Sequence, residues 1–96
     1  MVSDPIEVVQ SVKLSNRYGL HARASTRLAQ LAKEYESDVR LSREGIEEEV
    51  DAKSILGLLT LGAEKGQALR VRVRGVDAEG AMEAIVELFN RDFDEE

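Results

Sequence analysis

The chain has 96 residues, which is enough for one modest hydrophobic core and too few for two. Hydrophobic residues make up 43% of it and charged residues 33%, as is typical of a globular domain. It has no cysteine, which excludes disulfides, thiolate metal sites and thiol catalysis, and its formal net charge of −6 argues against nucleic acid as the main partner.

Two further function classes receive no support from the sequence. The longest apolar-rich run, residues 54–63, is too short to span a bilayer, and the N-terminus lacks the basic and apolar regions of a signal peptide. The absence of cysteine is compatible with the cytoplasm. We therefore expect a cytoplasmic protein, without a cofactor, a bound metal or membrane insertion, that acts as a monomer.

The first third of the chain is predicted to form a strand, a turn and a helix. Residues 6–14 are strand-like, and three apolar positions can face inward: Val8, Val12 and Leu14. Residues 15–19 have turn chemistry, because Asn tolerates unusual backbone angles and Gly permits positive φ. A helix then opens at His21 and runs to about residue 34 or 35, with apolar residues at three- and four-residue spacing.

A hairpin is predicted next. Residues 38–43 alternate between apolar and polar side chains, and Glu44-Gly45 provides a turn. The return strand would cover 46–51, with the acidic run 47–49 facing solvent at a sheet edge. Glu is a poor strand former, which makes this return strand the least secure element.

The apolar run after residue 54 predicts a short helix. Asp51 and Ser54 are both plausible N-caps, and Gly62 would stop the helix. Large side chains surround more than one face of so short a helix. They could all be core residues, but exposure of Leu56 and Leu59 would create an apolar patch of the kind that marks a partner site.

A strand and a helix complete the prediction. In a strand over 68–74, three arginines alternate with valines, which is simply the solvated face of a strand: Arg70, Arg72 and Arg74. Asp77 is the expected N-cap of a last helix, in which Ala81, Ile85, Leu88 and Phe89 line one face. The acidic tail 91–96 is expected to fray. The order β-α-β-β-α-β-α predicts one α+β domain over 1–96, with helices packed on one face of a sheet.

His21, the only histidine, lies at the predicted start of a helix, where backbone N–H groups without helical acceptors favour an anion. Arg23 adds a guanidinium that can grip phosphate oxygens. A neutral imidazole is a competent nucleophile, so His21 could accept a phosphoryl group. Equally, a lone His could merely cap the helix or pack at the turn. No second catalytic group lies nearby in the sequence, which argues against an autonomous enzyme.

Two segments carry a resemblance to a known family. Gly19-Leu20-His21-Ala22-Arg23 resembles the active-site signature of the HPr family of histidine-containing phosphocarrier proteins of the bacterial phosphoenolpyruvate-dependent phosphotransferase system. Lys53-Ser54-Ile55-Leu56-Gly57 resembles the regulatory-serine segment of that family. The likeness covers roughly residues 8–96, and the ending 88–96 looks more like the nitrogen-related branch, NPr, than the sugar-transport branch.

The resemblance implies an open-faced sandwich of four antiparallel strands covered on one side by three helices. Enzyme I would pass a phosphoryl group to Nδ1 of His21, which would hand it to an enzyme IIA domain, and Arg23 would stabilise the phosphoryl group. Ser54 would correspond to the serine modified by HPr kinase/phosphorylase, although helix capping is already a sufficient role for it. We also predict docking roles for Leu20, Ala22, Thr26, Ile55, Leu56 and Leu59.

The sequence departs from the family pattern at Ala24, where proline is usual. Proline suits the first turn of a helix, so Ala loosens this turn slightly. We expect altered rates or partner preference and no loss of function. The alternative to a carrier is a regulatory binding module, which would control its partners according to its phosphorylation state.

Overall fold

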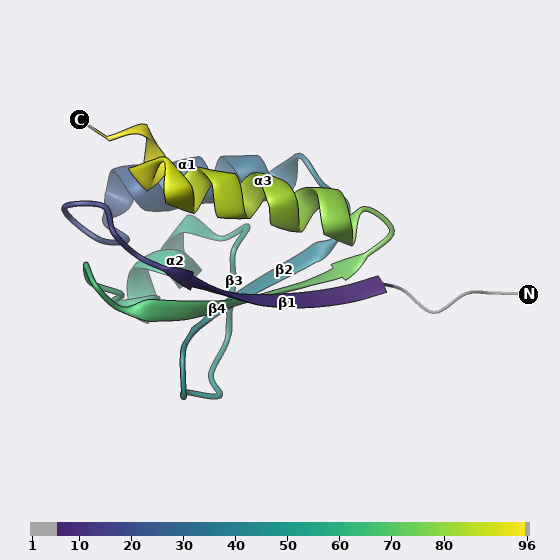
Figure 1. Cartoon of the computed structure of the whole chain (residues 1–96), viewed down its shortest axis with the longest axis horizontal. Coiled ribbons are helices and arrows are strands. Elements are labelled where there is room, and N and C mark those ends of the chain that lie inside the picture. Colours follow the sequence, from purple (N-terminus) through teal and green to yellow (C-terminus); the bar gives the residue numbers. More distant parts are fainter. Residues whose placement is uncertain (1–5, 96) are drawn as a thin grey trace, which may run out of the picture.

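The computed structural model describes residues 6–95. They form a four-stranded antiparallel sheet in the order β1-β4-β2-β3 (Figure 1). Its strands are β1 (Ile6–Lys13), β2 (Asp38–Arg43), β3 (Val50–Asp51) and β4 (Ala68–Gly75). Because β4 pairs with both β1 and β2, the last strand in the chain occupies the interior of the sheet.

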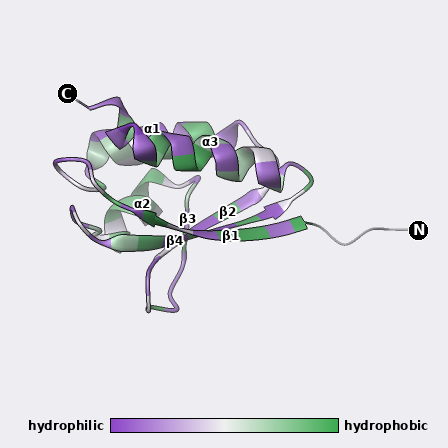
Figure 2. Ribbon diagram, viewed as in Figure 1, coloured by the Kyte–Doolittle hydropathy of each residue, from purple (hydrophilic) through white to green (hydrophobic). Residues whose placement is uncertain are grey.

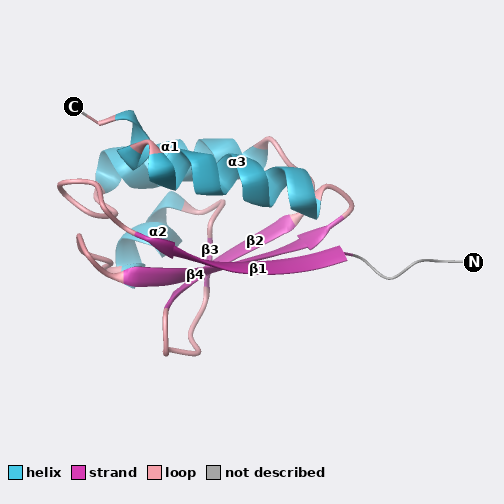
Figure 3. Ribbon diagram, in the orientation of Figure 1, coloured by secondary structure: helices cyan, strands magenta, loops and turns pink. Residues whose placement is uncertain are grey.

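Three helices cover one face of this sheet (Figure 3). They are α1 (Ala22–Lys33), α2 (Ile55–Leu61) and α3 (Ala78–Asn90). α1 contacts both α2 and α3, and α3 also packs on β1 and β4. The predicted two-layer α+β sandwich and its element order are therefore confirmed. No helix within residues 6–95 is long and apolar enough to cross a membrane.

The core lies between the helices and the sheet. In β4 the fully buried side chains of Leu69, Val71 and Val73 alternate with the arginines, as the strand period requires. Leu28 of α1 and Ile85 of α3 are likewise fully buried opposite them. Figure 2 shows green apolar residues in both layers. The predicted apolar faces therefore meet in one core.

The open face of the sheet carries an ionic network. Arg72 donates to both carboxylate oxygens of Glu49, at 2.5 and 2.9 Å, and to Glu7 of β1 at 2.9 Å. Arg70 lies 3.9 Å from Glu49. The hydrogen bonds from Arg72 hold the pKa of the Glu49 carboxyl below its usual value. The arginine face is polar as predicted, and part of it is neutralised within the chain.

The predicted return strand over 46–51 is too long. Only Val50 and Asp51 pair with β2, and residues 46–49 form a loop after a turn in which Gly45 has φ +85°. Glutamate is a poor strand former and gains little stability in an edge strand, whereas the loop allows Glu49 to bind Arg72 on the open face of the sheet. The charge pair therefore prevails over strand pairing in this segment.

The prediction that the C-terminal tail frays is also wrong for the part that the structure describes. After α3 the chain forms a 3-10 turn, η1 (Asp92–Asp94), whose residues all have positive φ. Phe93 is only 1% exposed and packs edge-to-face on Phe89, with a ring-centroid separation of 4.8 Å. Burial of this aromatic ring outweighs the acidic composition of the tail.

Helix capping partly follows the prediction. Ser54 caps α2, because its Oγ accepts from Gly57 N at 3.0 Å, whereas the Asp51 carboxylate accepts from Lys53 N. Asp77 precedes α3, but its carboxylate does not cap that helix. It accepts from the backbone N–H groups of Glu36 and Ser37 at 2.9 and 3.0 Å and ties the α1–β2 turn to the β4–α3 turn.

Candidate functional site

The loop before α1 fixes the position of His21. Gly19 has φ +67°, and a Cβ there would lie 2.6 Å from the carbonyl oxygen of Ala63. The missing side chain lets Leu20 N donate to that carbonyl at 3.1 Å. Asn16 is buried, and its Nδ2 donates to Gly19 O at 2.7 Å. The turn predicted over 15–19 is thus a closely packed support for the histidine.

His21 is the N-cap of α1, with extended backbone angles of φ −79° and ψ −176°. Its carbonyl accepts from Ser25 N at 2.9 Å, and its Nδ1 accepts from Arg23 N at 3.2 Å. The ring of Tyr18 stands edge-on to the imidazole, with a centroid separation of 5.6 Å. The structure therefore holds the ring with Nδ1 at the helix N-terminus, where the macrodipole favours an anion.

A carboxylate holds the other side of the ring. Glu95, directly after η1, contacts Nε2 of His21 through its Oε2. Its second oxygen, Oε1, accepts from Asn16 Nδ2 at 3.1 Å. The sequence did not predict this residue as part of the site, because a tail that is expected to fray gives none of its side chains a fixed position. The four-residue spacing from Phe89 to Phe93 was the available signal that the apolar face continues beyond α3.

The site opens to solvent beside these groups. A depression of about 480 Å³ is lined by Tyr18, His21, Ala22, Arg23 and Glu95. Arg23 is exposed, and within residues 6–95 its guanidinium has no hydrogen-bond or ion-pair partner. Together with the first-turn N–H groups, a guanidinium that lines the same depression as His21 can bind the oxygens of a phosphoryl group.

The predicted docking residues differ in their exposure. On α2, Leu56 is 72% and Leu59 40% exposed, as predicted, and Ile55 is partly buried. Of the α1 residues, Ala22 is exposed and Thr26 is partly buried, with its hydroxyl donating to Ala22 O at 2.7 Å. Since α1 contacts α2, we define the docking surface as the predicted docking residues that are at least partly accessible on these two helices: Ala22, Thr26, Ile55, Leu56 and Leu59.

Leu20 does not belong to this surface. Its side chain is only 5% exposed and forms part of the hydrophobic core. The same backbone bond to Ala63 that sets the loop turns Leu20 inward, so His21, next in the chain, is left at the surface. Its predicted docking role is therefore wrong. Ala24 is also fully buried, so the position that usually carries proline is a packed one here.

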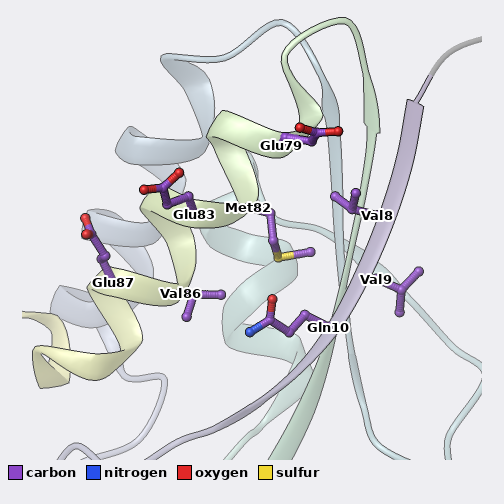
Figure 4. A pocket seen from close by; sticks show the side chains of 8 residues that line it. All are labelled: Val8, Val9, Gln10, Glu79, Met82, Glu83, Val86 and Glu87. Atoms are coloured by element: carbon purple, nitrogen blue, oxygen red, sulfur yellow. The ribbon is translucent and has the colours of Figure 1, made fainter.

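A second depression of about 480 Å³ lies between β1 and α3 (Figure 4). Val8, Met82 and Val86 form its apolar floor, and three carboxylates of α3 stand along it: Glu79, Glu83 and Glu87. It contains none of the predicted site residues.

Comparison with known proteins shows which family the chain resembles. Residues 8–91 match the sequence model of the PTS HPr component phosphorylation site. The chain is 43% identical over 83 residues to the phosphocarrier protein HPr of Xylella fastidiosa, covering 86% of this chain and 91% of that protein. It is 38% identical over 90 residues to the phosphocarrier protein NPr of Escherichia coli, covering 93% and 98%. The crystal structure of HPr-C-His from Thermoanaerobacter tengcongensis has a TM-score of 0.86 at 31% identity, covering 93% and 98%.

The fold and these relatives define a class, the histidine-containing phosphocarrier proteins. The chain belongs to the HPr family of the phosphotransferase system.

Proposed function

We propose that this protein is a cytoplasmic phosphocarrier in which Nδ1 of His21 accepts a phosphoryl group from enzyme I and passes it to an enzyme IIA domain. One observation carries the proposal. Nδ1 accepts from Arg23 N at the N-terminus of α1, and His21 and Arg23 line the same depression, where the Arg23 guanidinium has no partner within residues 6–95. Among residues 6–95 the site offers a nucleophile and an anion-binding site without a further catalytic group, so we assign catalysis to the partners.

The transfer needs no change in the number of protons on the ring. The lone pair of Nδ1 attacks phosphorus, and the bond from phosphorus to the donor breaks with its electron pair returning to the donor. Arg23 and the first-turn N–H groups bind the phosphoryl oxygens as the new bond forms. In the second transfer the acceptor attacks phosphorus, the bond from Nδ1 to phosphorus breaks, and its electron pair returns to Nδ1.

The docking surface provides a place for both partners. Leu56 and Leu59 expose apolar area on α2, which packs against the helix that carries His21. Burial of such area contributes to binding, and one shared surface requires the partners to bind in turn.

Ser54 supplies a means of regulation at the edge of this surface. Its hydroxyl caps α2 and is partly accessible. A phosphoryl group there would add about −1.5 to −2 charge at a helix N-terminus, where the fold tolerates it, and beside the apolar docking surface, where an acidic partner would be repelled. We propose that an HPr kinase/phosphorylase, where present, inhibits docking in this way.

The acceptor is proposed to be a nitrogen-type enzyme IIA. The ending 88–96 looks like that of NPr, and the similarity to a protein named NPr extends over 93% of the chain. The higher identity to a protein named HPr supports the sugar-transport branch as the alternative. Competition between the two types of enzyme IIA for the phosphorylated protein would separate the two branches.

Intact mass after incubation with enzyme I, Mg²⁺ and phosphoenolpyruvate tests the carrier. We expect one acid-labile phosphoryl adduct on the native protein and none on His21→Ala, with Tyr18→Phe as a folded control that keeps the acceptor. An absence of adduct with an active cognate enzyme I would refute the carrier. A purely regulatory binding module would then remain, and it would keep its partner affinity in His21→Ala.

A further inference from the structure

We propose that Glu95 is a positioning residue that keeps a proton on Nε2 of His21 throughout phosphoryl transfer and stabilises the phosphorylated ring. The inference rests on the proposed function and adds a group to it. Two observations carry it, the hydrogen bonds on the two ring nitrogens and the anchoring of the C-terminal turn, together with the charge that the ring acquires on phosphorylation.

The hydrogen bonds on the ring assign its tautomer. A backbone N–H can only donate, so the contact from Arg23 N requires a lone pair on Nδ1. An ionised carboxylate can only accept, so the contact with Glu95 requires the proton to be on Nε2. Both contacts therefore select the tautomer in which Nδ1 is the nucleophile.

Glu95 is held in place from two directions. Its other oxygen accepts from Asn16, which is 1% exposed and which also supports Gly19. The preceding turn is anchored by the buried ring of Phe93, whose carbonyl accepts from Arg27 of α1. All three residues of η1 have positive φ, which is an unfavourable backbone conformation that surrounding contacts of this kind must stabilise.

The role of the carboxylate follows from the charge balance. When Nδ1 shares its lone pair with phosphorus, the ring keeps its Nε2 proton and becomes cationic. The contact between Nε2–H and Glu95 changes from a hydrogen bond with one charged partner to one with two, which is stronger. When the phosphoryl group leaves, the electron pair returns to Nδ1, the ring is neutral again, and the proton has not moved. Glu95 thus shifts the equilibrium toward the phosphorylated carrier.

Two variants separate the charge of Glu95 from its acceptor atom. Glu95→Gln keeps an acceptor oxygen and removes the charge, whereas Glu95→Ala removes both. Asp94→Ala is the matched control, because it removes the same charge one residue earlier, where the carboxylate is exposed and bonds only Arg91 within residues 6–95.

The experiment uses two measurements on the full chain. The first is the exchange with water of the His21 Nε2 proton in the unphosphorylated protein, followed by NMR on [15N]histidine-labelled samples. The second is the equilibrium constant for phosphoryl transfer from phosphorylated enzyme I. A role limited to holding the fold would leave that constant unchanged in any variant that remains folded.

We expect slow exchange in the native protein and in Asp94→Ala, and fast exchange in Glu95→Ala. The equilibrium constant should fall roughly tenfold in Glu95→Gln, which reflects the difference between a charged and a neutral hydrogen bond, and should stay native in Asp94→Ala. Native equilibrium constants in both Glu95 variants would overturn the inference and leave the carrier intact. If the native protein accepts no phosphoryl group, the proposed function itself fails. Separately, slow exchange of the Nε2 proton that is unchanged in Glu95→Ala would show that the contact between Glu95 and His21 does not hold this proton, and would overturn the inference.

Discussion

Truncation of Phe93 should undock the C-terminal turn and release Glu95 from His21. Phe93→Ala removes a ring that is almost completely buried and that packs edge-to-face on Phe89. Burial of a phenylalanine side chain contributes about 1.5–3 kcal/mol. The aromatic pair adds about 0.5–1.5 kcal/mol. Because a terminal segment can detach and leave no cavity, we expect a loss of about 3 kcal/mol in the free energy of unfolding, at the low end of the range for truncation in a core.

Urea denaturation followed by circular dichroism measures this loss. Val76→Ala is the matched control, since Val76 is an exposed apolar side chain, and its truncation should change the free energy of unfolding by no more than about 0.5 kcal/mol. Phe93→Ala should also give the fast Nε2 proton exchange of Glu95→Ala, because the undocked turn takes away the carboxylate that Glu95→Ala deletes. A loss below about 1 kcal/mol, with native exchange, would contradict the docked turn.

Three further predictions concern the rest of the molecule. Ser54→Ala should cost about 1 kcal/mol in urea denaturation by loss of the N-cap, and Ser54→Asp should restore most of it; equal stability of all three forms would contradict the capping role. Leu56→Ala should weaken enzyme I binding in calorimetry with native stability, whereas Leu58→Ala should cost about 2–5 kcal/mol of stability, because Leu58 is fully buried. The lowered pKa of Glu49 stabilises the fold at pH values above the unfolded-state pKa of about 4.3, and this stabilisation is lost as the pH falls through the folded-state pKa. The midpoint of thermal unfolding of Glu49→Gln should therefore depend less on pH in this acidic range than that of the native protein.

The sequence was sufficient where local chemistry and periodicity agree. The spacing of apolar residues in α1 and α3, the alternation in β4 and the glycine turn before His21 each predict the local structure that the chain adopts. The exposure of Leu56 and Leu59 followed from geometry alone, since a short helix cannot bury every side of its apolar run.

Long-range contacts account for what the sequence did not predict. Glu49 and Arg72 are 23 positions apart, and their pairing removes residues 46–49 from the strand that a local reading predicted. Glu95 and His21 are 74 positions apart, and their contact depends on burial of Phe93 within a run of acidic residues. Leu20 looked like a surface residue of the motif, but a backbone bond to a distant loop turns it into the core.

The most direct test of the account is to locate the phosphoryl group on the phosphorylated protein. The 15N and 31P NMR spectra of [15N]histidine-labelled protein, recorded after phosphorylation by enzyme I, report which ring nitrogen is bonded to phosphorus. We predict coupling of phosphorus to Nδ1 of His21, with the proton retained on Nε2. Attachment at Nε2 would contradict the account, because Nε2 is the nitrogen that is hydrogen-bonded to Glu95.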